Sequence, residues 1–175
     1  MSIVSTERVT QLKEADLSSL CDATEAAIRD GIGFNWTSPP AREVLEAYWR
    51  GVLVVPERLL FASRLNGTVA GTIQLVKPPA SKQTTAFAAT ITNHFVAPWA
   101  RHHGLAKALL QAAEEEANKL GFMVINLTVR GTQDAAIHLY EENGYQRWGI
   151  HPAYEYINGR LVDGHHFWKR LRDHP

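Results

Sequence analysis

Residues 87–129 constrain the fold more than any other part of the sequence. Phe87–Val96 is rich in β-branched and apolar residues and predicts a strand. Apolar residues then recur at helical spacing from Leu105 to Leu120, and Phe122–Val129 predicts a second strand that is largely buried. A strand, a helix and a strand in this order form a parallel crossover. The fold must therefore include a parallel pair of strands.

The flanking segments predict antiparallel strands and further helices. Leu59–Leu65 and Thr68–Val76 meet at Asn66-Gly67, a strong signal for a two-residue hairpin. The tail predicts two more strands, Tyr145–Ile150 and His165–Leu171, separated by an Asn-Gly turn. Helical spacing predicts further helices at residues 17–28, 39–55 and 135–142. Asp16 is the expected N-cap of the first, and Thr37 or Ser38 that of the second. A short apolar segment, Val9–Leu12, precedes the first helix. We expect a mixed α/β fold, with helices on both faces of a mostly antiparallel sheet.

Length and composition suit one domain spanning residues 1–175. Hydrophobic residues make up 45% of the chain, and 18 Lys and Arg balance 18 Asp and Glu, so there is no basic surplus for nucleic acid. No apolar run approaches the roughly 20 residues that span a bilayer, and the first residues lack a secretory or transit pattern. The single cysteine, Cys21, cannot form an internal disulfide. We expect a soluble, cytoplasmic protein without nucleic-acid or membrane partners.

The turn at residues 96–106 has the pattern of an anion site. Val96-Ala97-Pro98 ends a strand, Arg101 and Gly104 stand three residues apart, and an amphipathic helix begins at Leu105. Amides at a helix N-terminus and the helix dipole attract negative charge, and a glycine lets a phosphate approach the backbone. Side chains with cationic or donor capacity surround it: Arg101, His102, His103 and Lys107. The alternative is a glycine-containing turn with a basic rim and no ligand.

This segment resembles a signature of the GNAT superfamily of N-acetyltransferases, Arg/Gln-x-x-Gly-x-Gly/Ala, which binds the pyrophosphate of acetyl-coenzyme A (acetyl-CoA). Leu127-Thr128-Val129, Gln133 and residues 136–145 resemble the family's second signature. Two motifs in the right order and spacing are more specific than either one alone. More weakly, the closing run from Tyr154 to Lys169 resembles the tail of a subgroup that includes the tabtoxin-resistance acetyltransferase. The resemblance implies the GNAT fold and acetyl-CoA as co-substrate.

The resemblance also implies roles for individual residues. The pyrophosphate would be held by the amides of Arg101, His102, His103, Gly104, Leu105 and Ala106, and the backbone of Phe95 and Val96 would pair with the pantetheine arm. Gln133 stands where the family commonly has Asn. Tyr140 occupies the position of the usual general acid, next to the cofactor.

Tyrosine suits the role of general acid. A phenol with a pKa near 10 can protonate a thiolate whose pKa is about 8.5, and it stays protonated at neutral pH. The backbone amide of Val96 would stabilise the oxyanion that forms at the thioester carbonyl. The alternative for Tyr140 is a core aromatic residue at the end of a helix.

The general base is left open by the sequence. The strand at residues 89–96 contains no carboxylate, and only His94 has a side chain suited to proton transfer at neutral pH. One alternative is that His94 is packed beneath a helix. Another is that the proton leaves through water, Asn93 or a backbone carbonyl.

Other clusters carry little chemistry. The adjacent pairs His102-His103 and His165-His166 lack the i, i+4 spacing of a zinc site, so we expect no metal. Cys21 lies far from both motifs, which favours direct transfer over an acetyl-cysteine relay. Four aromatic residues either line an acceptor pocket or serve in packing or a dimer interface: Phe34, Trp36, Tyr154 and Tyr156.

We therefore predict an enzyme that moves the acetyl group of acetyl-CoA to a primary amine of a small molecule, by direct attack in a ternary complex. The acceptor could be an amino acid, a polyamine, an antibiotic or a toxin. The alternatives are a non-catalytic acyl-CoA-binding regulatory module, transfer to protein amines, and transfer of a longer acyl group. A homodimer is also left open.

Overall fold

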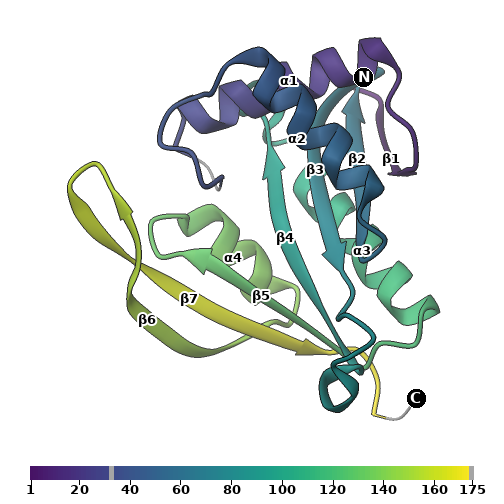
Figure 1. The fold of residues 1–175 in the computed structure, drawn as a ribbon, viewed down its shortest axis with the longest axis vertical. Coiled ribbons are helices and arrows are strands. Elements are labelled where there is room, and N and C mark those ends of the chain that lie inside the picture. Colours follow the sequence, from purple (N-terminus) through teal and green to yellow (C-terminus); the bar gives the residue numbers. More distant parts are fainter. Residues whose placement is uncertain (32–33, 174–175) are drawn as a thin grey trace. The chain divides into compact units, whose positions relative to one another are not determined.

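The protein is built from both helices and strands in a computed structural model that describes residues 1–31 and 34–173 (Figure 1). The strands are β1 (Val4–Val9), β2 (Arg58–Leu65), β3 (Thr68–Val76), β4 (Ala88–Val96), β5 (Val124–Arg130), β6 (Gln146–Ile157) and β7 (Arg160–Arg170). The helices are α1 (Glu14–Arg29), α2 (Arg42–Val54), α3 (Leu105–Lys119) and α4 (Asp134–Glu142), with short 3-10 turns at Gln83–Thr85 and Pro98–Ala100.

The strands form a mixed sheet in the order β1-β2-β3-β4-β5-β7-β6. β4 and β5 pair in parallel over Ala88–Ile91 and Val124–Leu127. The pairs β1–β2, β2–β3, β5–β7 and β6–β7 are antiparallel. The predicted mixed α/β fold and its parallel crossover are therefore confirmed.

The chain divides into two compact units, each described by itself. The first unit comprises Met1–Val76 and Asn93–Ala113, and the second comprises Lys77–Thr92 and Glu114–Pro175. β4 and α3 each begin in one unit and end in the other. A single domain over residues 1–175 stays a prediction.

The first unit is a helix-covered sheet. Asn66 and Gly67 have φ angles of 51° and 85°, the left-handed conformations that a two-residue turn between β2 and β3 requires. α1 and α2 cover one face of the strands, and the first half of α3 lies behind the other face (Figure 1). The core beneath α1 and α2 buries Phe34, Leu45 and Trp49. Each such side chain contributes about 1.5–3 kcal/mol by leaving water.

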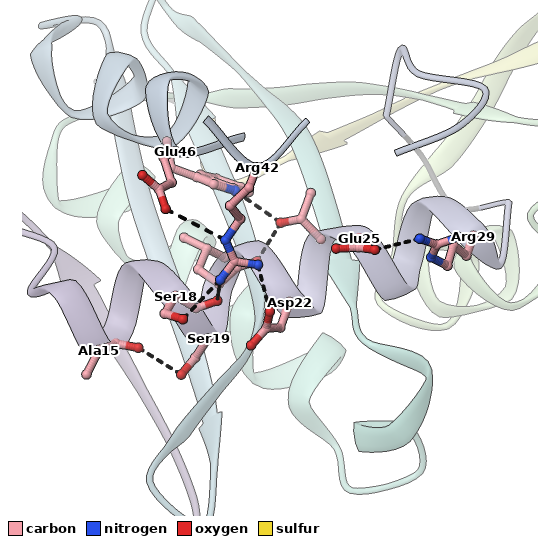
Figure 2. A network of polar contacts seen from close by, with 11 residues as sticks. Ala15, Ser18, Ser19, Asp22, Glu25, Arg29, Arg42 and Glu46 are labelled. Atoms are coloured by element: carbon pink, nitrogen blue, oxygen red, sulfur yellow. Dashed lines mark hydrogen bonds and ion pairs between the residues drawn. The ribbon is translucent and has the colours of Figure 1, made fainter. Parts of the chain in front are cut away.

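Polar contacts fix the packing of α2 on α1 (Figure 2). The guanidinium of Arg42 donates to the carbonyl and hydroxyl oxygens of Ser18 at 2.8 and 3.0 Å and to Asp22 at 2.7 Å. In the core, the indole of Trp49 donates to the hydroxyl of Thr24 at 3.0 Å. Because the indole hydrogen bond is buried, losing one partner would leave the other unsatisfied, which costs about 1–3 kcal/mol. This interface sets the position of α2.

The second unit is built on the hairpin of β6 and β7. Asn158 and Gly159 turn the chain with φ angles of 50° and 79°, as the Asn-Gly pair predicts. β7 then pairs with β5 from Arg170 at Val124 to Gly164 at Arg130. α4 follows β5 and ends at Glu142.

Several predicted boundaries differ from the structure. Lys13, not Asp16, is the N-cap of α1, because the Asp16 carboxylate accepts from Arg64 at 2.7 Å inside the first turn. The N-cap of α2 is Ala41, so the helix starts after Pro39-Pro40 and not within them. Residues that precede a proline are driven out of the helical region, which explains the later start.

The strands also differ in extent. The sequence predicted a short apolar start at Val9–Leu12, whereas the structure has the strand β1 at Val4–Val9. This edge strand is largely polar and exposed, so it carries no apolar signal. β6 and β7 are longer than predicted, since hairpin pairing continues through exposed residues with no apolar signal. Among the described residues, no helix is both long and apolar enough to cross a membrane.

Candidate functional site

β4 continues beyond its parallel partner. Its pairing with β5 covers Ala88–Ile91, and Asn93 then adopts a φ of 48°, which interrupts the regular strand. Asparagine tolerates this left-handed conformation better than most residues. Residues 94–96 therefore follow a local break in the strand.

The backbone after this break has one paired and one open direction. The Ala97 amide donates to the carbonyl of Ala70 at 2.7 Å, and the Phe95 carbonyl faces Gly71 of β3 so closely that a Cβ there would collide with it. Successive residues of a strand direct their backbone groups to opposite edges. The amide and carbonyl of Val96 consequently point away from β3, as a segment that pairs with an extended ligand requires.

The turn that follows is shaped by two side chains. The Arg101 guanidinium donates to the carboxylate of Asp30 at 2.5 Å and so forms an ion pair at the end of α1. Nδ1 of His103 donates to the carbonyl of Arg101 at 2.7 Å. His102 and Gly104 have φ angles of 63° and 81°. The side chains of Arg101 and His103 therefore shape the turn itself.

The same turn gathers free amides at the start of α3. In the described part of the chain, the amides of residues 102–106 donate to no acceptor, and the first bonded amide is that of Ala108, 3.0 Å from the Gly104 carbonyl. The positive end of the helix dipole adds to them. Nothing lies within 4 Å of the place where a Cβ of Gly104 would stand. The Arg101 amide, predicted to join them, instead donates to the Pro98 carbonyl at 3.4 Å. The free amides of residues 102–106 have the arrangement that a pyrophosphate group would need, and residues 101–106 are called the cofactor loop below.

His94 contacts this loop from β4. Its Nε2 lies 3.0 Å from the carbonyl oxygen of Ala106, so Nε2 carries the proton and donates. Burial lowers the pKa of His94 to about 4, although the hydrogen bond to Ala106 acts in the opposite direction. The imidazole is therefore neutral at pH 7 and a weaker base than an ordinary histidine.

The remaining predicted site residues belong to the second unit. The ring of Tyr140 is buried and packs against Tyr145 and Phe167, with centroids 5.6 and 6.2 Å away. Burial raises the pKa of the Tyr140 phenol above its ordinary value. Gln133 is the N-cap residue of α4, and its carbonyl accepts from the Ile137 amide at 3.0 Å.

A cavity of about 500 Å³ lies within the first unit. Two of the four aromatic residues singled out in the sequence, Phe34 and Trp36, line it, together with Tyr48, Arg58 and Asn93. Tyr154 and Tyr156 lie instead on β6, where both are exposed. The cavity therefore reaches β4 at the residue just before the 94–96 segment.

His165, His166 and Cys21 lie outside the two motifs. His166 hydrogen-bonds Thr128, and His165 hydrogen-bonds Asp163. Within residues 1–31 and 34–173, no group of three His, Cys, Asp or Glu side chains could hold a metal ion. Cys21 is fully buried, and burial raises the pKa of its thiol.

Comparison with known proteins places the chain in a family. The model of the acetyltransferase (GNAT) family matches residues 20–145. The chain belongs to the GNAT family. This confirms the predicted family and, with it, acetyl-CoA-dependent N-acetyltransferase activity.

Individual GNAT relatives agree in sequence and in fold. An Azospirillum brasilense protein, named as an uncharacterized N-acetyltransferase in the hisH–hisA intergenic region, is 57% identical over 133 residues, which cover 76% of this chain and 79% of that protein. A Salmonella typhimurium acetyltransferase solved with acetyl-CoA has a TM-score of 0.79 at 17% identity, covering 98% of this chain and 95% of its own. A phosphinothricin acetyltransferase from Sinorhizobium meliloti, also with acetyl-CoA, has a TM-score of 0.78 at 19% identity and coverages of 96% and 88%.

Sequence reasoning missed part of the cavity. Tyr48 was predicted only to lie on the apolar face of a helix, and Arg58 precedes the strand predicted at Leu59–Leu65. Neither belongs to a motif, so only the folded arrangement brings them to one cavity. No local pattern indicates the Arg101–Asp30 pair, whose partners are 71 residues apart.

Proposed function

We propose that this chain acetylates the primary amine of a small molecule by direct attack on acetyl-CoA within a ternary complex. The observation that carries the proposal is the cavity of about 500 Å³, which touches β4 at Asn93. A cavity of this size encloses a small molecule. It lies in the same unit as the cofactor loop and the 94–96 segment, which supports an acceptor site beside the acetyl donor.

The cofactor loop would bind the pyrophosphate of acetyl-CoA through its free amides. The open edge of β4 at Val96 would pair with the pantetheine arm and direct one N–H toward the thioester carbonyl. Acetyl-CoA supplies the thioester that the amine attacks. As negative charge develops on the carbonyl oxygen, the Val96 amide would donate to it, and donors of this kind contribute about 10²- to 10³-fold in rate.

Tyr140 is the proposed general acid for the departing thiolate. Its raised pKa, caused by burial, keeps the phenol protonated at neutral pH. The same burial fits a core aromatic, and substitution separates the two roles. Gln133 would contact the cofactor through its side-chain amide.

The proton of the attacking amine needs an acceptor. His94 was one candidate, but a pKa of about 4 favours the alternative route through water, Asn93 or a backbone carbonyl. His94 then acts by holding the first turn of α3, including Ala106, against β4. Direct transfer is further supported by Cys21, whose thiol is fully buried and has a raised pKa.

The test is a thiol-release assay with acetyl-CoA and a panel of small amines, with propionyl-CoA and succinyl-CoA as alternative donors. We expect amine-dependent release of CoA and an acetylated small molecule identified by mass spectrometry. Binding of acetyl-CoA without acetylation of any amine would favour a regulatory acyl-CoA-binding module. Acetylation of protein or peptide amines alone would contradict the small-molecule proposal.

A further inference from the structure

The cavity of the first unit has aromatic walls. The rings of Phe34 and Trp36 stack with centroids 6.1 Å apart, and Tyr48 meets Trp36 edge-on at 5.4 Å. Val52 adds an aliphatic surface. Walls of this kind bind the apolar body of a ligand, and the few polar groups among them decide its orientation.

Arg58 gives this cavity its charge. No acidic side chain lines it within the described residues, where the other polar side chains are neutral. In the same part of the chain Arg58 forms no ion pair, whereas Arg42, Arg64 and Arg101 each contact a carboxylate. The cavity therefore holds a guanidinium without a counter-ion.

A buried amide holds Arg58 in place. Nη1 of Arg58 donates to Oε1 of Gln74 at 2.7 Å, and the Gln74 side chain is fully buried. Nε2 of Gln74 in turn donates to the hydroxyl of Tyr48 at 3.2 Å. Because the Tyr48 oxygen is the acceptor, its own proton is directed to another group. Arg58, whose guanidinium has five N–H donors, and Tyr48 can thus both donate to one ligand.

We propose that the acceptor is an amine that also carries a carboxylate, an amino acid in the broad sense, and that Arg58 and Tyr48 bind the carboxylate. This inference rests on the proposed acetyl transfer to a small amine. The apolar body of the acceptor packs on Trp36 and Phe34, and its amine lies toward Asn93, next to the 94–96 segment of β4. Arginine suits this role because its planar fork matches a carboxylate.

The same arrangement excludes two acceptor classes that the sequence left open. Polyamines and polycationic antibiotics carry a second positive charge, which would meet Arg58 with no carboxylate in the cavity to offset it. Like charges brought together in a partly enclosed site repel more strongly than in water. These amines should be poor acceptors.

The kinetic test uses three kinds of acceptor: amino acids that have an apolar side chain, the carboxamides of the same amino acids, and spermidine. We expect kcat/KM for the carboxylates to exceed that for the carboxamides by about 10- to 100-fold, the usual effect of hydrogen bonds to a charged group. Arg58→Gln should remove this preference, Arg58→Lys should retain part of it, and Tyr48→Phe should reduce it. The matched control is Arg50→Gln. Arg50 lies on the same helix as Tyr48 but is exposed and pairs with Glu14, so this variant should retain the full preference.

Binding provides a readout that does not depend on acetyl transfer. Trp36 lines the cavity, so tryptophan fluorescence of the protein with CoA should change on titration with an amino acid, less with its carboxamide, and little in Arg58→Gln. Equal use of carboxamides or spermidine by an active enzyme would overturn the inference and leave the proposed function standing. Carboxylate-selective binding without acetyl transfer to any amine would uphold the site and contradict the proposed function. Neither binding nor selectivity would overturn the inference.

Discussion

Nε2 of His94 donates a hydrogen bond to the carbonyl oxygen of Ala106, 3.0 Å away, and so joins the end of β4 to the first turn of α3. The two segments that this bond connects are those proposed to bind the pantetheine arm and the pyrophosphate. A histidine in this setting, with a pKa of about 4, serves the site through geometry more than through proton transfer.

His94→Gln should therefore retain most activity, because a glutamine amide can still donate to the Ala106 carbonyl. We expect kcat within about fivefold of wild type, compared with the 10²- to 10⁴-fold loss typical of a missing general base. His94→Leu removes the donor and should weaken acetyl-CoA binding. The measurements are kcat and kcat/KM against pH from 6 to 8.5, and the dissociation constant of acetyl-CoA, for all three proteins. A loss of more than about a hundredfold in kcat for His94→Gln, with acetyl-CoA affinity unchanged, would restore His94 as the base.

The pKa of His94 also predicts how stability depends on pH. In the unfolded chain the imidazole titrates near 6.5, whereas in the folded protein burial lowers the pKa to about 4. The unfolded state therefore binds more protons between these values, so the folded state loses stability as the pH falls from about 6.5 to 4. Urea denaturation of wild type and His94→Gln at pH 7, 5.5 and 4.5 should show a smaller loss in the variant. Parallel losses in both proteins would refute this contribution.

Gly71 keeps β3 close to the Phe95 carbonyl. A Cβ at this position would collide with that backbone oxygen and crowd Val96, and neither can move without displacing β4. Gly71→Ala should lower the free energy of unfolding by about 2–4 kcal/mol, as severe overpacking does. The matched control is Gly149→Ala, where nothing lies within 4 Å and no loss is expected. Chemical denaturation measures both, and equal stability of the two variants would contradict the close approach.

Tyr140→Phe should separate chemistry from packing. The ring and its contacts with Tyr145 and Phe167 remain, so folding and acetyl-CoA affinity should change little. If Tyr140 is the general acid, kcat should fall about 10²- to 10⁴-fold. Because burial raises its pKa, the wild-type phenol stays protonated to high pH, and the deficit should persist through pH 9.

The control for Tyr140→Phe is Tyr145→Phe. It removes a hydroxyl from the adjacent buried ring in the same unit and should leave kcat within about threefold of wild type. The measurement is kcat against pH with the acceptor found in the amine panel. If both variants retained near-normal rates, Tyr140 would be a core aromatic and water would protonate the thiolate.

The sequence predicted most features that depend on local pattern. The two Asn-Gly turns and the glycine at the start of α3 follow from conformational preferences of a few neighbouring residues, and the parallel crossover follows from the order strand, helix, strand. It failed where a distant partner decides the outcome. Asp16 pairs with Arg64 instead of capping α1, and no local signal indicates this.

The candidate site likewise combines features that local sequence predicts with contacts that it does not. The cofactor loop was predicted from its glycine and its place before a helix, and its binding role stays a prediction. The pairing of Arg101 with Asp30 and the joining of Arg58, Gln74 and Tyr48 depend on residues far apart in the chain. Such contacts follow from tertiary packing, which periodicity does not encode.

The central claim is that the amides of the cofactor loop bind the pyrophosphate of acetyl-CoA, and titration calorimetry of Gly104→Val with acetyl-CoA tests it most directly. Gly67→Val is the control, because Gly67 has a similar φ, 85° against 81°, and equally open surroundings in the β2–β3 turn. Both variants should lose similar stability without ligand. Acetyl-CoA should bind wild type and Gly67→Val with similar affinity and Gly104→Val much more weakly. At a hundred times the wild-type dissociation constant, it should accordingly raise the free energy of unfolding of the first two proteins by about 2.7 kcal/mol, with most of that gain lost in Gly104→Val. Acetyl-pantetheine, which lacks the pyrophosphate, should bind all three proteins alike. Equal acetyl-CoA affinity in folded Gly104→Val and wild type would contradict the assignment of the loop.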